Sequence, residues 1–193
     1  MTTKQLWLLT GGNGAGKTTF YHHFLASTGL PFINADIIAR NLDNKNSEAI
    51  SYEAAKIAGK LRHDMLQRGS SFCFETVFSH PSKIDFIAEA KALGYQIILI
   101  YIHLQTDTLN QARVAQRVTE GGHNVPTDKI VSRIPRTMTH VNSAIPLADI
   151  VKIYDNSSKV TPYTPIAEIK SGRVHAQINP LPEWTAIILD GHI

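Results

Sequence analysis

The sequence has a single cysteine, Cys73, and no apolar run as long as the roughly 20 residues that a membrane-spanning helix requires. A disulfide within the chain is therefore excluded, and the apolar surroundings SSFCFET indicate that Cys73 is an inert core thiol. The nine histidines form neither an HExxH motif nor a Cys/His ligand pattern, which argues against a structural zinc site. The first residues, MTTKQLWLLT, lead into a glycine loop and not into a cleavable signal, so we expect a cytoplasmic protein without membrane contacts.

The excess of positive charge is small, because the formal net charge is only +3. A general nucleic-acid-binding surface is therefore not indicated. The basic residues are nevertheless concentrated in one short region, which contains Arg113, Arg117, Lys129, Arg133 and Arg136. This concentration predicts an anionic ligand near that region.

Apolar runs alternate with helical patterns along most of the chain. The runs that predict strands lie at residues 5–10, 30–34, 72–76, 95–104 and 149–157. The segments with helical spacing lie at residues 17–27, 50–65, 82–93, 106–118 and from about 127 onward. Such alternation predicts an α/β fold, with a mostly parallel sheet flanked by helices and ligands at the carboxyl ends of the strands.

At 193 residues, the chain has the length of one α/β domain, and we expect residues 1–193 to form a single unit. Within it we expect an arginine-rich lid at about 107–141 and a small C-terminal hairpin at about 163–180. Pro135 lies inside the lid's second helix and is expected to kink that helix or to end it early.

The segment GGNGAGKT at residues 11–18 satisfies the phosphate-binding pattern GxxxxGK[ST] and lies between a predicted strand and a predicted helix. In such a P-loop the backbone N–H groups and the helix N-terminus surround phosphate groups. We expect Lys17 to reach the β- and γ-phosphates of ATP and Thr18 to place its hydroxyl on Mg²⁺. The remaining predicted nucleotide-binding residues of this segment are Gly11, Gly12, Asn13, Gly14, Ala15, Gly16 and Thr19.

Motifs of other P-loop proteins are missing. The chain has no NKxD motif for guanine, no LSGGQ motif of transporter ATPases, and no apolar strand that ends in an Asp-Glu pair. These absences argue against GTPases, transporter ATPases and hydrolytic motors. A small P-loop kinase needs only a phosphate cradle, an acceptor carboxylate and arginines over the transferred phosphoryl group, so the fold prediction becomes P-loop kinase-like.

One acidic residue follows a predicted strand and another lies at the end of one, so both are directed to the same edge of the sheet as the P-loop. Asp36 is the candidate base that orients the acceptor hydroxyl and takes its proton, and the alternative is that it caps the following helix. Glu75 could bind acceptor hydroxyls or a Mg²⁺-bound water, and the alternative is a buried structural carboxylate. Thr76 and Ser79 are further candidates for the acceptor pocket.

The arginine-rich region can stabilise charge on a phosphoryl group, because a guanidinium contacts several phosphate oxygens at once. Arg117 is the strongest candidate, and Arg133 is the second catalytic candidate. The alternative is that some of Arg113, Arg133 and Arg136 are solvated residues on a helix face.

In combination, GGNGAGKTT, NADIIAR, FCFETVFS, RVTEGGHNVPTDKIVSR and IYDNS resemble the zeta toxin family of P-loop kinases, particularly its short standalone members. The resemblance implies an ATP-dependent kinase for a hydroxyl of UDP-N-acetylglucosamine or a related sugar nucleotide. It implies that Asp36 is the catalytic aspartate and that Glu75 and Thr76 line the acceptor pocket. It also places Arg117 and Arg133 in the family's phosphate-binding segment and Asn156 near the nucleotide base.

Two other functions remain as alternatives. One is a P-loop kinase for a different metabolite, such as a nucleoside, a cofactor or a simple sugar alcohol. The other is a non-catalytic ATP-binding switch or interaction module of a toxin–antitoxin system. The expected partners are accordingly ATP, a small acceptor and, for a toxin–antitoxin system, an antitoxin-like protein.

Overall fold

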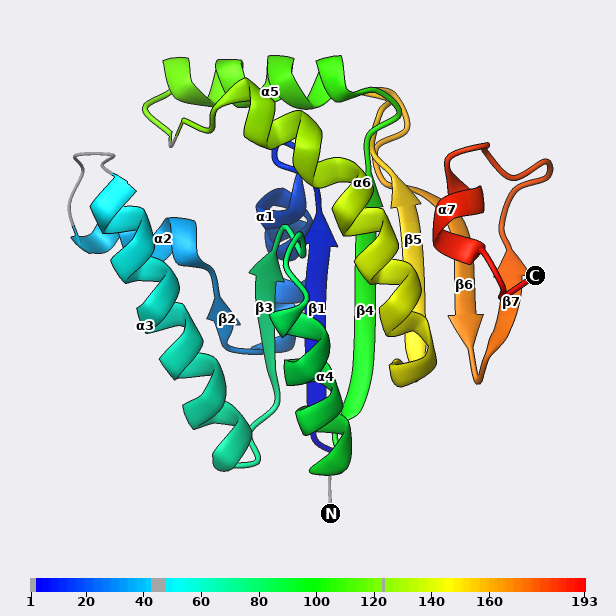
Figure 1. Cartoon of the computed structure of the whole chain (residues 1–193), viewed down its shortest axis with the longest axis horizontal. Helices are drawn as coiled ribbons and strands as arrows, with labels where there is room; N and C mark the ends of the chain where they lie inside the picture. The colour runs from blue at the N-terminus through cyan, green and yellow to red at the C-terminus, as the bar shows by residue number, and fades with distance from the viewer. Residues whose placement is uncertain (1–2, 43–47, 123) are drawn as a thin grey trace.

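The computed structural model describes residues 3–42, 48–122 and 124–193. In this part of the chain seven strands form one sheet in the order β2-β3-β1-β4-β5-β6-β7 (Figure 1). The strands are β1 (Gln5–Gly11), β2 (Phe32–Ile33), β3 (Phe72–Thr76), β4 (Gln96–His103), β5 (Ile150–Asp155), β6 (Thr164–Lys170) and β7 (Arg173–Ala176). The first five pair in parallel, whereas β6 and β7 are antiparallel additions at one edge.

Helices lie in the connections between the parallel strands, and one more helix follows the last strand. In chain order they are α1 (Lys17–Phe20), α2 (Ala35–Leu42), α3 (Glu48–Gln67), α4 (Ser82–Ala92), α5 (Asp107–Thr119), α6 (Thr127–Ala144) and α7 (Thr185–Leu189). The first continues as a wider π-type turn at Tyr21–Leu25 and a tighter 3-10 turn at Ala26–Thr28, and another 3-10 turn at Ile145–Leu147 follows α6. Across the described residues, none of the helices combines the length and the apolar character needed to traverse a bilayer.

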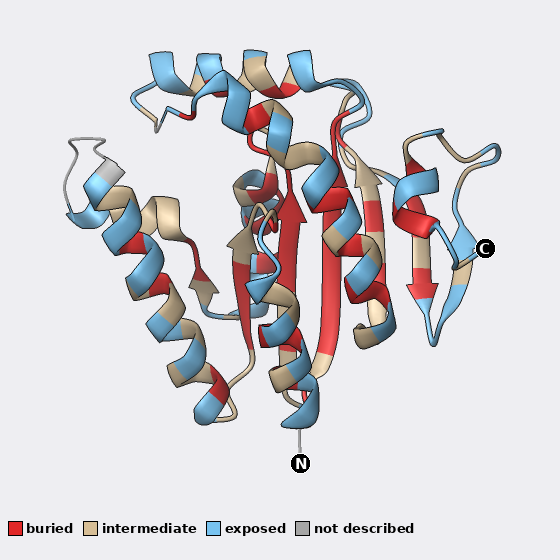
Figure 2. Cartoon of the chain, in the orientation of Figure 1, coloured by how far each residue is buried: buried red, intermediate tan, exposed pale blue. Residues whose placement is uncertain are grey.

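The two faces of the sheet are covered unequally. One face packs against α3, α4, α6 and α7, which contribute Ala58, Leu66, Phe86, Ile87, Ala90, Met138, Val141, Ala144, Ile188 and Leu189. The other face packs against α1 and its continuation through Phe20, Tyr21 and Leu25. Strands β1 and β4 are therefore buried on both faces, as Figure 2 shows, and this explains why their sequences are continuous apolar runs.

Strand register brings the functional segments to one edge. β1 and β3 are aligned so that Leu9 pairs with Glu75 and Thr10 pairs with Thr76. The glycine loop therefore leaves β1 directly beside the end of β3. Helix α5 lies across the same carboxyl edge of the sheet, above the ends of β1 and β4 (Figure 1). The phosphate loop, the acidic strand end and the arginine-bearing helix thus meet at one place.

The predicted α/β fold, with its mostly parallel sheet and C-terminal hairpin, is confirmed. The hairpin also pairs with β5, so it extends the main sheet. Of the two outcomes expected for Pro135, a kink or an early end of its helix, the early end is wrong, because α6 continues to Ala144. A proline removes one backbone hydrogen bond, but the burial of Met138 and Val141 after it holds the helix to the core. The short helix α7 was not predicted, since five residues carry little periodicity.

Candidate functional site

The glycine loop turns sharply between β1 and α1. Gly14 and Gly16 have φ values of 77° and 93°, a conformation that residues with a Cβ rarely adopt. Space is also restricted, because a Cβ on Gly16 would lie 2.6 Å from Nδ2 of Asn156 and 2.9 Å from the hydroxyl of Tyr163. Glycine at position 16 is therefore required both by the backbone conformation and by the neighbouring β5 segment.

Three side chains hold the carbonyl groups of the loop. Nδ2 of Asn110 donates to the carbonyl of Asn13 at 2.6 Å, and Nδ2 of Asn156 donates to the carbonyl of Ala15 at 2.9 Å. The hydroxyl of Tyr163 donates to the carbonyl of Gly16 at 2.9 Å. Burial raises the pKa of Tyr163, which keeps this donor protonated. The loop is thus fixed in a shape in which successive backbone N–H groups can surround a phosphate.

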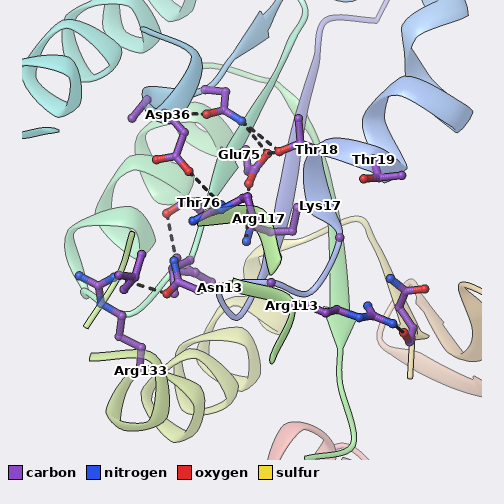
Figure 3. Close-up of a pocket in the computed structure, with 18 of the residues that line it drawn as sticks. Asn13, Lys17, Thr18, Thr19, Asp36, Glu75, Thr76, Arg113, Arg117 and Arg133 are labelled. Atoms are coloured by element: carbon purple, nitrogen blue, oxygen red, sulfur yellow. Dashed lines mark hydrogen bonds and ion pairs between the residues drawn. The ribbon is translucent and has the colours of Figure 1, made fainter. Parts of the chain in front are cut away.

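Lys17 and Thr18 both contact Glu75 at the end of β3. The ammonium of Lys17 is 3.5 Å from Oε1 of Glu75 and donates to the carbonyl of Gly12 at 2.9 Å. The hydroxyl of Thr18 donates to Oε2 of Glu75 at 2.6 Å, and Nδ2 of Asn34 donates to the same oxygen at 2.7 Å (Figure 3). Lys17 is only 6% exposed, so this ion pair is shielded from solvent.

Asn34 also determines how helix α2 begins. Its side-chain oxygen accepts hydrogen bonds from the backbone N–H groups of Asp36 at 2.7 Å and of Ile37 at 3.2 Å. Asn34 therefore caps α2 in place of Asp36. The carboxylate of Asp36 is directed toward Arg117 on α5, with 3.5 Å between Oδ2 and the guanidinium nitrogen (Figure 3). The carboxylate of Asp36 and the guanidinium of Arg117 thus approach each other from opposite sides of the site.

The arginines separate into two groups. Arg133 donates to the side-chain oxygen of Asn13 at 3.4 Å, and Arg113 donates to the carbonyl of Asn156 at 2.8 Å. Both line the cavity, as does Arg117. Arg136 is exposed and bonds to Ser132 on its own helix, as expected for a solvated helix face.

A cavity of about 1170 Å³ joins these elements. The sequence-predicted residues that line it are Asn13, Gly14, Gly16, Lys17, Thr18, Thr19, Asp36, Glu75, Thr76, Ser79, Arg117, Arg133 and Asn156. Gly11, Gly12 and Ala15 belong to the loop but do not line this space. The structure therefore brings the donor, acceptor and arginine candidates to one cavity, while their roles remain predictions.

Sequence reasoning missed three residues that build the site. Asn34 follows β2 directly and precedes α2, so its capping role could have been inferred from position. Asn110 is a polar residue within an amphipathic helix, and Tyr163 lies in a connecting segment. Neither carries a sequence signal, because the contact with the glycine loop arises only from the tertiary fold.

The donor atoms beside the P-loop suit a hard divalent cation. The hydroxyl of Thr18 and the carboxylate of Glu75 supply oxygen atoms, which are the ligands that Mg²⁺ prefers. Within the described residues no group of three or more His, Cys, Asp and Glu side chains forms a metal cluster. A magnesium ion held by few protein oxygens together with nucleotide phosphates fits this arrangement.

Known proteins are similar to this chain in sequence or in fold. The chain is 29% identical over 140 residues to an uncharacterized protein of Haemophilus influenzae, covering 69% of this chain and 99% of the relative. The crystal structure of the AvrRxo1-ORF1:-ORF2 complex with ATP matches with a TM-score of 0.73 and 17% identity over 91% of this chain. This chain spans only 61% of that chain's length.

A structure of the PezAT chromosomal toxin–antitoxin system of Streptococcus pneumoniae matches with a TM-score of 0.58 and 16% identity, over 80% of this chain and 69% of that one. At such identities these structures show a common fold. The family model "Zeta toxin" matches residues 2–165, which is most of the sequence. The chain therefore belongs to the zeta toxin family and has the P-loop kinase-like fold.

Proposed function

We propose that this protein is a kinase that transfers the γ-phosphoryl group of ATP to a hydroxyl of a small acceptor, UDP-N-acetylglucosamine or a related sugar nucleotide. One observation carries the proposal: the P-loop residues Lys17 and Thr18 share a cavity with the carboxylates of Asp36 and Glu75. A phosphate cradle alone would serve many functions, but a carboxylate opposite the cradle provides a group for the acceptor alcohol.

The donor side of the cavity is the P-loop. Backbone N–H groups of Gly14 and Gly16 and the ammonium of Lys17 would neutralise the β- and γ-phosphates. Arg113, Asn156 and Tyr163 line the cavity beside the loop and would adjoin the nucleoside. The relative that was crystallised with ATP supports ATP as the donor.

Mg²⁺ would be held by the hydroxyl of Thr18, with Glu75 accepting hydrogen bonds from its water ligands. When bound, the ion would offset the negative charge of the phosphates that face the acceptor. Glu75 would at the same time keep the ammonium of Lys17 in place, since it contacts both residues.

On the acceptor side Asp36 would orient the hydroxyl. The oxygen of the acceptor hydroxyl would attack the γ-phosphorus in line with the leaving group, while the hydroxyl proton passes to the carboxylate of Asp36. The bond between the γ-phosphorus and the β–γ bridging oxygen breaks, and ADP leaves. Arg117 and Arg133 would neutralise the charge on the transferred group, because both line the same cavity.

The choice of a sugar nucleotide as acceptor rests on membership of the zeta toxin family and on the acceptor segment FETVFS at residues 74–79. The PezAT toxin–antitoxin system among the structural relatives supports an antitoxin-like protein as a partner. The reaction itself does not require that partner.

An acceptor screen tests the proposal. The protein is incubated with ATP, Mg²⁺ and a panel of sugar nucleotides, nucleosides and sugar alcohols, and products are identified by mass spectrometry. We expect a phosphorylated UDP-sugar. Turnover of a different acceptor alone would replace the sugar-nucleotide assignment with a kinase for another metabolite.

The variant Asp36→Asn separates a kinase from a non-catalytic switch. It retains the size of the side chain but removes the proton acceptor, so turnover should fall by about 10²-fold or more. Binding of a fluorescent ATP analogue should be retained. Turnover equal to that of the wild type would reject Asp36 as the base.

A further inference from the structure

The cavity continues beyond the reacting groups into a second arm. From Glu75 and Thr76 it follows the segment after β3 toward α4, and its opposite wall is formed by α2 and α3. Small side chains line that wall, among them Ala39, Ala55 and Ala58. They leave room for a part of the acceptor that lies away from the hydroxyl to be phosphorylated.

Two half-buried cations from different helices line this arm, Arg62 on α3 and Lys83 on α4, and a third cation, Arg40 on α2, is exposed to solvent. Among the described residues no carboxylate lies within ion-pair distance of Arg62 or Lys83. The ammonium of Lys83 donates to its neighbour Ser82 at 3.4 Å. The guanidinium of Arg62 lies over the rings of Phe74 and Phe86, at 5.1 and 5.8 Å from their centroids, and its Nε is buried without a hydrogen-bond partner.

The electrostatics of the pair are unfavourable without a ligand. Burial lowers the pKa of Arg62 below its ordinary value. Burial also lowers the pKa of Lys83, and the positive charge of Arg62 lowers it further. Two like charges that are partly removed from water, one of them with a buried Nε–H that lacks a hydrogen-bond partner, are compensated when an anion binds.

We propose that Arg62 and Lys83 form an anion subsite for the acceptor, which binds a phosphate or carboxylate group remote from the hydroxyl that is phosphorylated. This inference rests on the proposed kinase function, because it assigns the second arm to the acceptor. A planar guanidinium and a mobile ammonium bind the oxygens of either group in the same way. A neutral sugar would leave the two charges uncompensated, so the subsite selects anionic acceptors.

Binding in the absence of transfer tests the subsite. The protein is first saturated with a non-hydrolysable ATP analogue and Mg²⁺, which fills the P-loop, and is then titrated calorimetrically with matched sugars. N-acetylglucosamine 1-phosphate is compared with N-acetylglucosamine, and glucuronate with glucose. We expect at least one anionic sugar to bind ten-fold or more tightly than its neutral counterpart, and the two pairs separate a phosphate from a carboxylate specificity.

The variants Arg62→Gln and Lys83→Gln should each reduce the affinity for the preferred anionic sugar by about 10- to 100-fold, the range for a lost charged hydrogen bond. Affinity for the neutral sugar should change less than three-fold. Lys60→Gln is the matched control, since Lys60 is an exposed residue of the same helix outside the cavity. It should bind as the wild type does.

A purely structural role for Arg62 is separable from ligand binding. Arg62→Met retains contact with Phe74 and Phe86 but has no charge, so it should melt near the wild-type temperature and still lose the preference. Lys83→Gln gives an independent measurement should Arg62 variants fold poorly. Equal binding of anionic and neutral sugars by the wild type, or a preference retained by Lys83→Gln and Arg62→Met, would overturn the subsite.

The binding readout also distinguishes this inference from the proposed function. If the wild-type protein transfers phosphate to no acceptor but still prefers anionic sugars, the kinase function is rejected and the anion subsite is retained. Transfer to acceptors without any anion preference would reject the subsite and keep the kinase.

Discussion

At the scale of single residues, Glu75 connects the two functional side chains of the P-loop. Its carboxylate contacts the ammonium of Lys17 and accepts a hydrogen bond from the hydroxyl of Thr18. Glu75→Gln keeps the shape but removes the charge, so we expect kcat to fall by about 10²- to 10³-fold, measured as ADP released with a coupled assay. Glu89→Gln, a change at an acid outside the cavity, is the control. A kcat for Glu75→Gln within two-fold of the wild type would contradict this role.

His103 at the end of β4 predicts a stability change with pH. Burial lowers its pKa from the ordinary value of 6.5 to about 4, although the charge of Asp155 acts in the opposite direction. The side chain is 6% exposed, contacts the hydroxyl of Tyr101 at 2.9 Å and stacks on Trp184 at 4.1 Å. Below pH 6.5 the unfolded chain therefore binds a proton that the folded protein excludes.

Since the unfolded state binds more protons in this range, the free energy of unfolding decreases as the pH falls from 6.5 toward 4. The contribution of His103 between pH 6.5 and pH 5 is roughly 1.5 kcal/mol. Urea denaturation at both pH values measures it. Between these pH values the free energy of unfolding of His103→Phe should decrease by less than that of the wild type, and the difference should be about the contribution of His103. An equal decrease in both proteins would show that His103 does not titrate in this way.

Much of the site could be predicted one residue at a time, because position after a strand determines where a side chain lies. Asp36 follows β2 and Glu75 lies at the end of β3, so both were expected at the carboxyl edge, where the structure places them. Arg62 gave no such signal. It lies in the middle of a helix, and only the packing of α3 against α4 brings it beside Lys83.

At the scale of secondary-structure elements, the turn from β1 into α1 is fitted against the segment after β5. Gly16→Ala would bring a Cβ within 2.6 Å of Asn156 and would also strain a φ of 93°. We expect the variant to lose most of its ATP affinity and more than about 2 kcal/mol of stability. Equilibrium binding and urea unfolding measure the two effects.

Gly29→Ala is the matched control for that substitution. Gly29 also has a positive φ, 71°, but a Cβ there would meet nothing within 4 Å. Gly29→Ala should lower the free energy of unfolding by about 1 kcal/mol through backbone strain and leave ATP affinity unchanged. Should the two variants bind ATP equally well, contact with Asn156 would not determine the shape of the loop.

Predictability of the elements depended on their length and on how they are buried. The long apolar run of β4 identified a strand because parallel strands are covered on both faces. Pro135 does not end α6 early, which was one of the two outcomes expected for it, since the local preference of proline is outweighed by burial of the residues after it. The pairing of β6 with β5 is likewise a tertiary outcome that a hairpin signal alone does not specify.

At the scale of the whole molecule, the cavity is assembled from distant parts of the chain. The P-loop follows the first strand, Glu75 lies at the end of the third, and Asn156 follows the fifth. A parallel sheet brings these three points together because all its strands end at one edge. The general location of the site was therefore predictable from βαβ order, whereas its second arm required the positions of α2 and α3.

Because ligands would bridge these parts, nucleotide binding should stabilise the entire domain. At an ATP-analogue concentration of 100 times Kd, the folded state gains about 2.7 kcal/mol, which corresponds to an increase in Tm of about 5–10 °C for a domain of this size. Differential scanning fluorimetry measures the change. Lys17→Ala should remove most of the increase because it deletes the ammonium that faces the phosphates, whereas Lys60→Ala should keep it. An increase in Lys17→Ala equal to that of the wild type would place the triphosphate outside the P-loop, and the proposed transfer from the loop to an alcohol held by Asp36 would then be untenable.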